Sequence, residues 1–94
     1  MTTEKKSVLV LARNDHAEAM RVAAGLTIFG HQVRLIFMSR PVSEADAEGE
    51  QAELLELSEI VPETTVAEMR DALSFLDAAT LGAAISASDA VVNI

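Results

Sequence analysis

The fold is decided by the stretch SVLVLARNDHAEAMRVAAGLTIFGHQVRLIFM, residues 7–38. Its two ends are apolar runs of the kind that form buried strands, and no hairpin turn lies between them. The middle favours a helix, because Asn14 or Asp15 can cap its start and Gly30 stands where a left-handed residue would end it. A strand, a helix and a strand in this order form a βαβ unit with parallel strands. The stretch therefore predicts an α/β fold.

The rest of the chain continues the alternation of helices and strands. Leu54, Leu55 and Leu57 are expected to supply the buried side of an acidic helix. The order predicts a small doubly wound open sheet of about four parallel strands, with helices on both faces, in a single domain spanning residues 1–94. The elements expected after residue 38 are helices at about 44–57 (weak before Gly49), 66–75 and 81–87, and strands at 59–61 and 90–94.

Charge is distributed unevenly along the chain. The net charge is −8, and the segment from Pro41 to Met69 holds nine carboxylates and no Lys or Arg. Neither a nucleic-acid partner nor a membrane surface is expected, because both attract cationic proteins. Two interpretations of the acidic stretch 44–63 are open: a docking face for a basic partner, or a solvated helix or loop.

Cysteine is absent from the 94 residues, which excludes disulfides, thiolate metal sites and thiol nucleophiles in this sequence. No apolar run reaches the roughly 20 residues that span a bilayer, and residues 1–6 lack the apolar core of a secretory signal. The expected location is therefore the cytoplasm. A domain of this size buries only roughly 60–65% of its unfolded surface, so we expect it to associate into a homo-oligomer.

Polar side chains gather where the first predicted strand ends. Ligands of open parallel sheets bind at the carboxyl ends of strands, and the N–H groups that begin a helix favour anions. Arg13 ends a buried strand and needs a partner, such as an anion or a carboxylate. Two interpretations of His16 are open: a general base, or an exposed residue of an ordinarily capped helix. The candidate ligand-binding residues are Arg13, Asn14, Asp15 and His16 after the first strand and Glu63 and Thr64 after the third.

Neither a metal, a cofactor nor a catalytic residue is predicted. His31 follows Gly30 at the amino end of the sheet, so it is not expected to share a metal with His16. The glycine-rich motifs that bind dinucleotides or nucleotide phosphates do not occur in the sequence. No serine stands in the motif that forms a nucleophile elbow.

Three segments resemble the DsrE-like family of small sulfur-relay proteins. They are AEAMRVAAGL at residues 17–26, FGHQVRLIFM at 29–38 and SDAVVNI at 88–94. Each is a packing signature rather than a catalytic motif. The resemblance implies a flavodoxin- or Rossmann-type three-layer sheet and assembly into homo- or hetero-oligomers. In some members of the family, a cysteine in the loop after a central strand carries persulfide sulfur.

The chain departs from the family pattern at that loop. The corresponding residues, 61–65, read VPETT, so they hold no cysteine to carry a persulfide. The resemblance then implies a non-catalytic oligomeric subunit or adaptor (a dimer, trimer or hexamer) linked to intracellular sulfur metabolism, with sulfur-relay or redox proteins as partners. The alternative is a small-molecule or anion-binding module at the carboxyl edge of the sheet, and an enzyme with His16 as its base ranks last.

Overall fold

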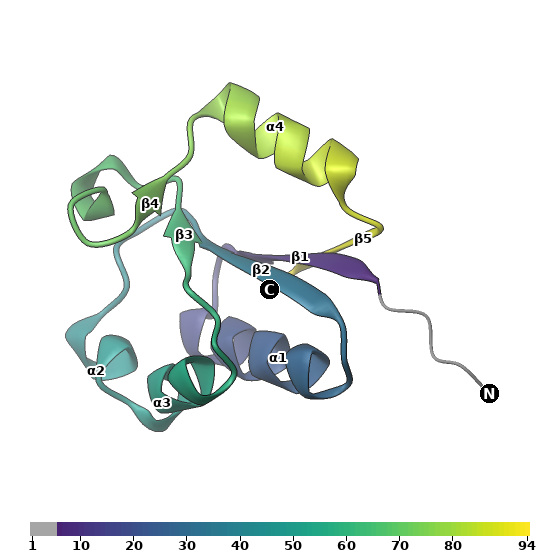
Figure 1. Ribbon diagram of the computed structural model, residues 1–94. Coiled ribbons are helices and arrows are strands. Elements are labelled where there is room, and N and C mark those ends of the chain that lie inside the picture. The colour runs from purple at the N-terminus through teal and green to yellow at the C-terminus, as the bar shows by residue number, and fades with distance from the viewer. Residues whose placement is uncertain (1–5) are drawn as a thin grey trace.

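The computed structural model describes residues 6–94, which form one sheet of five parallel strands (Figure 1). The predicted α/β class is confirmed, with five strands in place of about four. Helices cover both faces, so the domain has three layers. The strands are β1 (Ser7–Ala12), β2 (Gln32–Phe37), β3 (Glu63–Thr64), β4 (Ser74–Phe75) and β5 (Ala90–Asn93), in the spatial order β4-β3-β2-β1-β5.

The βαβ unit predicted from residues 7–38 is confirmed. Between β1 and β2 runs α1 (His16–Ile28), and the Asp15 carboxylate caps it by accepting a hydrogen bond from the Glu18 N–H at 3.0 Å. Such a cap stabilises a helix by about 1 kcal/mol. Gly30 has a φ of +91° and ends the helix in the left-handed conformation that glycine adopts without strain.

The acidic stretch forms two short helices, as predicted: α2 (Glu44–Ala47) and α3 (Glu50–Leu57). Gly49 separates them, and a Cβ at this position would lie only 2.9 Å from the Ala45 carbonyl oxygen. The expected buried side of α3 is wrong in part. Leu55 is buried, but Leu54 is 37% exposed and Leu57, at the end of the helix, is 81% exposed.

The strand predicted at residues 59–61 is wrong, because those residues terminate α3. The Ile60 N–H reaches back to the Leu55 carbonyl at 3.0 Å, and Glu59 takes a positive φ of 59°. This is the geometry of a helix C-cap, in which a left-handed residue turns the chain away. The strand therefore starts only after Pro62, where Glu63 and Thr64 pair with the end of β2.

The helix predicted at residues 66–75 is also wrong. It is a single 3₁₀ turn, η1 (Ala67–Met69), and the chain then folds back so that Ser74 and Phe75 pair with β3 as β4. Strand pairing with a distant segment overrides the local helix signal. By contrast, α4 (Ala78–Ala87) begins before the predicted Leu81, because Asp77 caps it at the Thr80 N–H.

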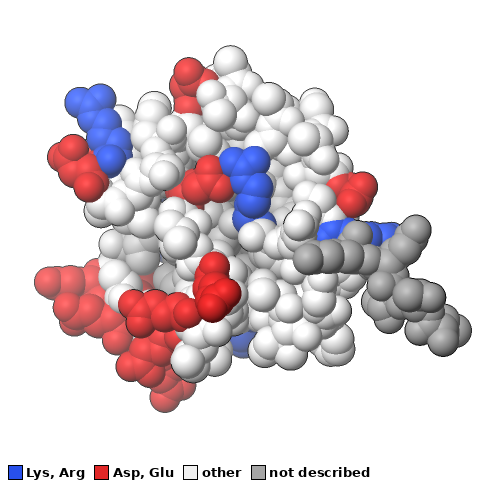
Figure 2. Space-filling view, viewed as in Figure 1, with Lys and Arg blue, Asp and Glu red and all other residues white. Residues whose placement is uncertain are grey.

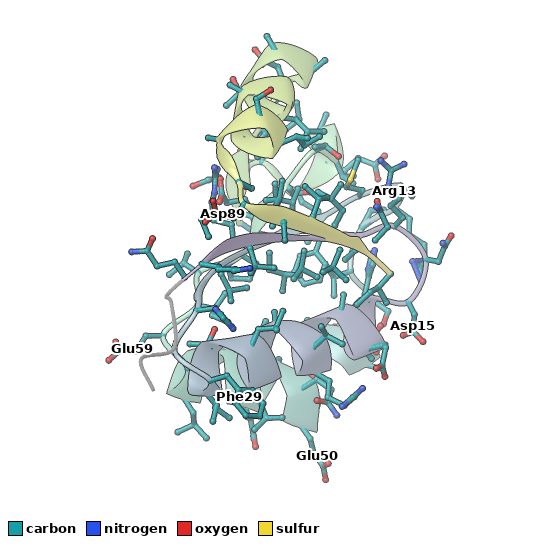
Figure 3. All side chains as sticks on the ribbon, turned by 90° about the vertical axis from the view of Figure 1, so that its right-hand side faces the viewer. Arg13, Asp15, Phe29, Glu50, Glu59 and Asp89 are labelled. Atoms are coloured by element: carbon teal, nitrogen blue, oxygen red, sulfur yellow. The ribbon has the colours of Figure 1, made fainter. Side chains whose placement is uncertain are left out.

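The core lies on both faces of the sheet, which Figure 3 shows edge-on with α4 above and α1 below. Because side chains alternate along β1, consecutive residues of this strand enter different layers. The layer under α1 and α3 is the larger one. It contains Val8, Val10, Ala12, Ala19, Met20, Ala23, Leu35, Phe37 and Leu55, and the layer under α4 contains Leu9, Leu11, Ile36, Leu76 and Ala84.

Within residues 6–94, no helix combines the length and the apolar character needed to cross a bilayer.

Candidate functional site

The residues predicted after the first strand do come together, at the carboxyl ends of β1 and β5. Figure 3 shows Arg13 and Asp15 at this end of the sheet, opposite Phe29 and Glu59. The strand order changes direction between β1 and β5, because α1 leads from β1 to β2 on one face and α4 precedes β5 on the other. Ligands of doubly wound sheets commonly bind at such a point.

Several of the polar groups at this point are bonded to one another, although the buried Nδ1 of His16 has no hydrogen-bond partner within residues 6–94. The Arg13 Nε donates to Asn93 Oδ1 at 2.9 Å. The backbone N–H groups of Asn14 and Asp15 both donate to the Ile94 carbonyl, at 3.0 and 3.3 Å. The partner of Arg13 is thus an amide of the same chain and not the expected anion or carboxylate, and the cluster fastens β5 to β1.

Arg40 joins this cluster from the loop after β2. Its Nη2 donates to the Asn14 carbonyl at 2.9 Å. The sequence places Arg40 at the carboxyl end of a strand, but nothing local indicates that its side chain crosses to the start of α1. Two arginines therefore stand at this edge, and each holds a neighbouring segment in place.

His16 is buried, with 1% of its surface exposed, so the interpretation of an exposed histidine is wrong. Its Nε2 lies 3.2 Å from the Met38 carbonyl oxygen and 3.5 Å from Arg40 Nη1. One nitrogen cannot both donate to the carbonyl and accept from the guanidinium, and the shorter contact favours a proton on Nε2. The ring packs against Phe37, with 5.1 Å between the ring centroids. His16 therefore serves as a packed link between α1 and the end of β2.

Glu63 and Thr64 do not join Arg13 and His16, because they form β3 itself instead of a loop beyond it. Glu63 accepts two hydrogen bonds from Arg34 on the neighbouring strand, at 2.9 and 2.8 Å. This pairing raises the pKa of the Arg34 guanidinium above its ordinary value. The Thr64 hydroxyl is buried, donates to the Phe37 carbonyl at 3.0 Å and accepts from the Val66 N–H at 2.9 Å. Both side chains hold β3 against β2.

Across the part of the chain that the structure describes, no group of three or more His, Asp or Glu side chains is arranged to hold a metal ion. His31 lies at the amino end of β2, as predicted, where its Nδ1 accepts from the Lys6 N–H at 3.3 Å.

The molecular surface divides into an acidic region and an uncharged one. Figure 2 shows the carboxylates gathered over α2 and α3, whereas the surface over α4 is almost free of charge. The ten residues of α4 include no charged side chain, and Ala84 is its single buried residue. Beside α4, Val91 of β5 is 37% exposed, and within residues 6–94 β5 pairs with β1 alone. We call α4 and β5 together the uncharged face.

A second group of exposed apolar side chains stands at and just after the ends of α1 and α3. Its four side chains are the most exposed large apolar residues of residues 6–94, and carboxylates such as Glu56 and Glu59 stand beside them in the sequence. This acid-flanked patch consists of Ile28, Phe29, Leu57 and Val61, which are between 76% and 81% exposed.

Comparisons with protein-family models, with curated proteins and with solved structures found no match for this chain. Its function has to be argued from its own contacts, charges and surfaces.

Proposed function

We propose that this chain is a non-catalytic, self-associating subunit or adaptor built on a DsrE-like scaffold. The observation that carries the proposal is the uncharged face. Helix α4 consists of Ala, Leu, Ile, Gly, Ser and Thr residues, and one side of it alone packs on the sheet. A surface helix normally turns a charged stripe towards water, and a helix without one is normally covered on all sides. Contact with another protein surface is therefore more favourable for the outer side of α4 than exposure to water.

A second copy of this chain is the occupant that the charge distribution favours. The acidic helices α2 and α3 lie on the opposite face of the sheet from α4 (Figures 1 and 2). Two copies that meet through α4 and β5 keep these carboxylates far apart, which limits repulsion between chains that each carry a net charge of −8. Within residues 6–94, the outer edge of β5 has no partner strand, so a strand of a second copy can pair with it.

The acid-flanked patch is a poor surface for self-association and a better one for a different partner. Contact between two copies through Phe29 and Leu57 would bring Glu56 and Glu59 of both chains together, and like charges at an interface oppose binding. A basic partner with apolar side chains would meet complementary charge there. This patch supports the adaptor half of the proposal.

The non-catalytic half of the proposal rests on the chemistry available. The 94 residues contain no cysteine. Where the resemblance places a cysteine-bearing loop, Thr64 is buried in β3 with its hydroxyl engaged in two hydrogen bonds. The link to intracellular sulfur metabolism is carried by the resemblance to DsrE-like proteins. The alternative function, anion binding at the carboxyl edge, has weaker support because Arg13 and Arg40 there already bond to other parts of the chain.

The test is sedimentation velocity over a range of concentrations, with one cation introduced on each apolar surface. Ala83→Arg places a guanidinium on the exposed side of α4, and Phe29→Arg places the same group in the acid-flanked patch. We expect Ala83→Arg to convert the oligomer to a monomer and Phe29→Arg to leave it intact. An oligomer that survives Ala83→Arg but dissociates with Phe29→Arg would overturn the assignment of the interface.

A further inference from the structure

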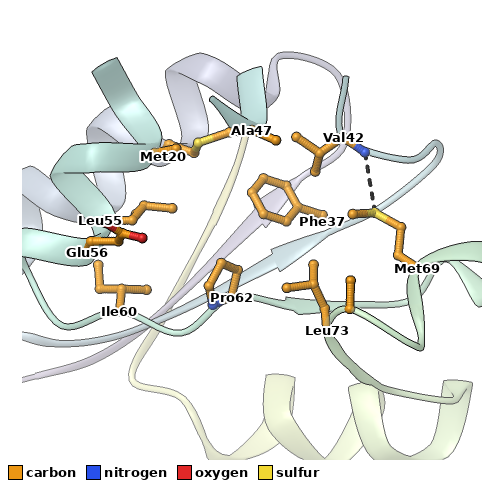
Figure 4. A pocket seen from close by; sticks show the side chains of 12 residues that line it. Met20, Phe37, Val42, Ala47, Leu55, Glu56, Ile60, Pro62, Met69 and Leu73 are labelled. Carbon is orange, nitrogen blue, oxygen red and sulfur yellow. Dashed lines mark hydrogen bonds between the residues drawn. The ribbon is translucent and has the colours of Figure 1, made fainter. Parts of the chain in front are cut away.

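The edge of the sheet formed by β3 and β4 leaves space that its own chain does not fill. Each of these strands has two residues, and the connection between them is the single 3₁₀ turn η1. In a doubly wound sheet, a full helix usually covers such an edge. Here a cavity of about 280 Å³ lies between α3, the end of β2 and the segment that carries η1 (Figure 4).

The walls of this cavity are almost entirely apolar. Figure 4 shows the Phe37 ring near its centre, with Met20 and Leu55 on the helix side and Met69 and Leu73 on the η1 side. Glu56 is the one charged residue among the twelve that line it. The remaining lining residues are Val42, Ala47, Ala52, Ile60, Pro62 and Ala72.

Two of the walls can adapt to an occupant. Met20 and Met69 are unbranched and flexible, and methionine adjusts to apolar partners of different shape. The Met69 sulfur accepts a hydrogen bond from the Val42 N–H at 3.3 Å, which links η1 to the loop after β2.

The size and the charge of the cavity define the class of ligand. An apolar cavity of roughly 150 Å³ stays dry and binds benzene, so this larger one has room for about two fused rings. Glu56 stands at the wall, and no Lys or Arg is among the lining residues to neutralise an anionic head group. We infer that this cavity is a binding site for a neutral hydrophobic molecule of about the size of a bicyclic aromatic compound. The site lies across the sheet from α4 and is independent of the proposed self-association.

The inference is tested with two fluorescent probes that share one ring system. 2-Methoxynaphthalene is neutral, and naphthalene-2-sulfonate carries an anionic sulfonate on the same two fused rings. We expect the neutral probe to bind saturably to the unmodified chain, about tenfold more tightly than the sulfonate, because Glu56 repels the anion. Glu56→Gln should reduce the difference between the dissociation constants of the two probes, because it removes the charge that repels the sulfonate.

Variants with larger side chains in the cavity wall show whether the probe binds inside the cavity. Ala52→Leu adds side-chain volume from α3, and Ala72→Leu adds it from the exposed segment after η1, where an extra side chain does not disturb the core. Each should weaken binding of the neutral probe about tenfold by occupying its volume. Ala67→Leu is the matched control on η1, because Ala67 is exposed and does not line the cavity.

Two results would overturn the inference. One is the absence of saturable binding of the neutral probe to the unmodified chain. The other is binding that remains unchanged in Ala72→Leu, whose fold is verified by circular dichroism, since the probe would then lie elsewhere on the surface.

Discussion

The two faces of the sheet are closed in different ways. Under α1 and α3, nine buried residues form a core, and the outer sides of these helices carry charged side chains such as Glu18, Arg21 and Glu53. Under α4, five buried residues form a smaller core, and the outer side of the helix carries no charge at all. The outer side of the first face therefore suits contact with water. On the second face, α4 has the uncharged composition of a buried helix, but its outer side is exposed. This contrast is the basis of the proposed self-association.

The largest effect is expected from truncating one leucine on each face. Leu35 is fully buried in the larger core, and Leu35→Ala should lower the free energy of unfolding by about 3 kcal/mol. Leu81 of α4 is partly buried against the smaller core, and Leu81→Ala should cost about 1 kcal/mol in the monomer. Urea unfolding, at a protein concentration where the chain is monomeric, measures both losses of unfolding free energy. Equal losses would mean that α4 packs as tightly as α1, which would remove the contrast.

A smaller effect is expected at the edge of the first face, where Arg34 and Glu63 join β2 to β3. The pair is partly exposed, with 44% of the Arg34 side chain and 18% of the Glu63 side chain accessible to water. Glu63→Gln should therefore cost only about 0.5–1 kcal/mol in urea unfolding. The matched control is Glu18→Gln, which breaks the more exposed pair between Glu18 and Arg21 and should cost less. If Glu18→Gln lowers the free energy of unfolding more than Glu63→Gln does, the two-residue strand β3 does not depend on the pair between Arg34 and Glu63.

The smallest effect concerns the cap that starts α4. Hydrogen bonds from Thr80 lower the pKa of the Asp77 carboxyl below its ordinary value. Because the folded state binds the proton less readily than the unfolded state, the charged cap stabilises the fold at neutral pH. That contribution is lost as the pH falls through the lowered pKa, below about pH 4.

Thermal unfolding of the Asp77→Asn variant at several pH values tests this effect. Asparagine also caps helices but carries no charge in this range. The melting temperature of the variant should lie slightly below that of the unmodified chain at pH 7, and the difference should shrink towards pH 3. A difference that does not change with pH would assign the effect of Asp77 to its shape and not to its charge.

The first half of the fold could be predicted from the sequence because its signals are local. Five apolar residues in β1, the Asp15 cap and the left-handed Gly30 each act within a few positions of the chain. The region from Ile60 to Phe75 could not be predicted, because strands of two residues carry no periodicity. Their position depends on tertiary pairing, because β3 pairs with β2, which is distant in the sequence, and β4 pairs with β3.

The candidate site also contains features that local sequence signals predict and features that depend on distant contacts. The gathering of Arg13, Asn14, Asp15 and His16 could be foreseen, because parallel strands bring their carboxyl ends to one edge. The burial of His16 and the reach of Arg40 to Asn14 could not, since both depend on the path of the loop after β2. The misplacement of Glu63 follows directly from the error in the position of the third strand.

Native mass spectrometry of the unmodified chain, across micromolar concentrations, tests the central claim most directly. The account predicts that the chain is a dimer or a higher oligomer even though each copy carries a net charge of −8, because the uncharged face lets the acidic helices stay apart. A chain that remains monomeric at every concentration would contradict the account. The outer side of α4 would then be in contact with water alone.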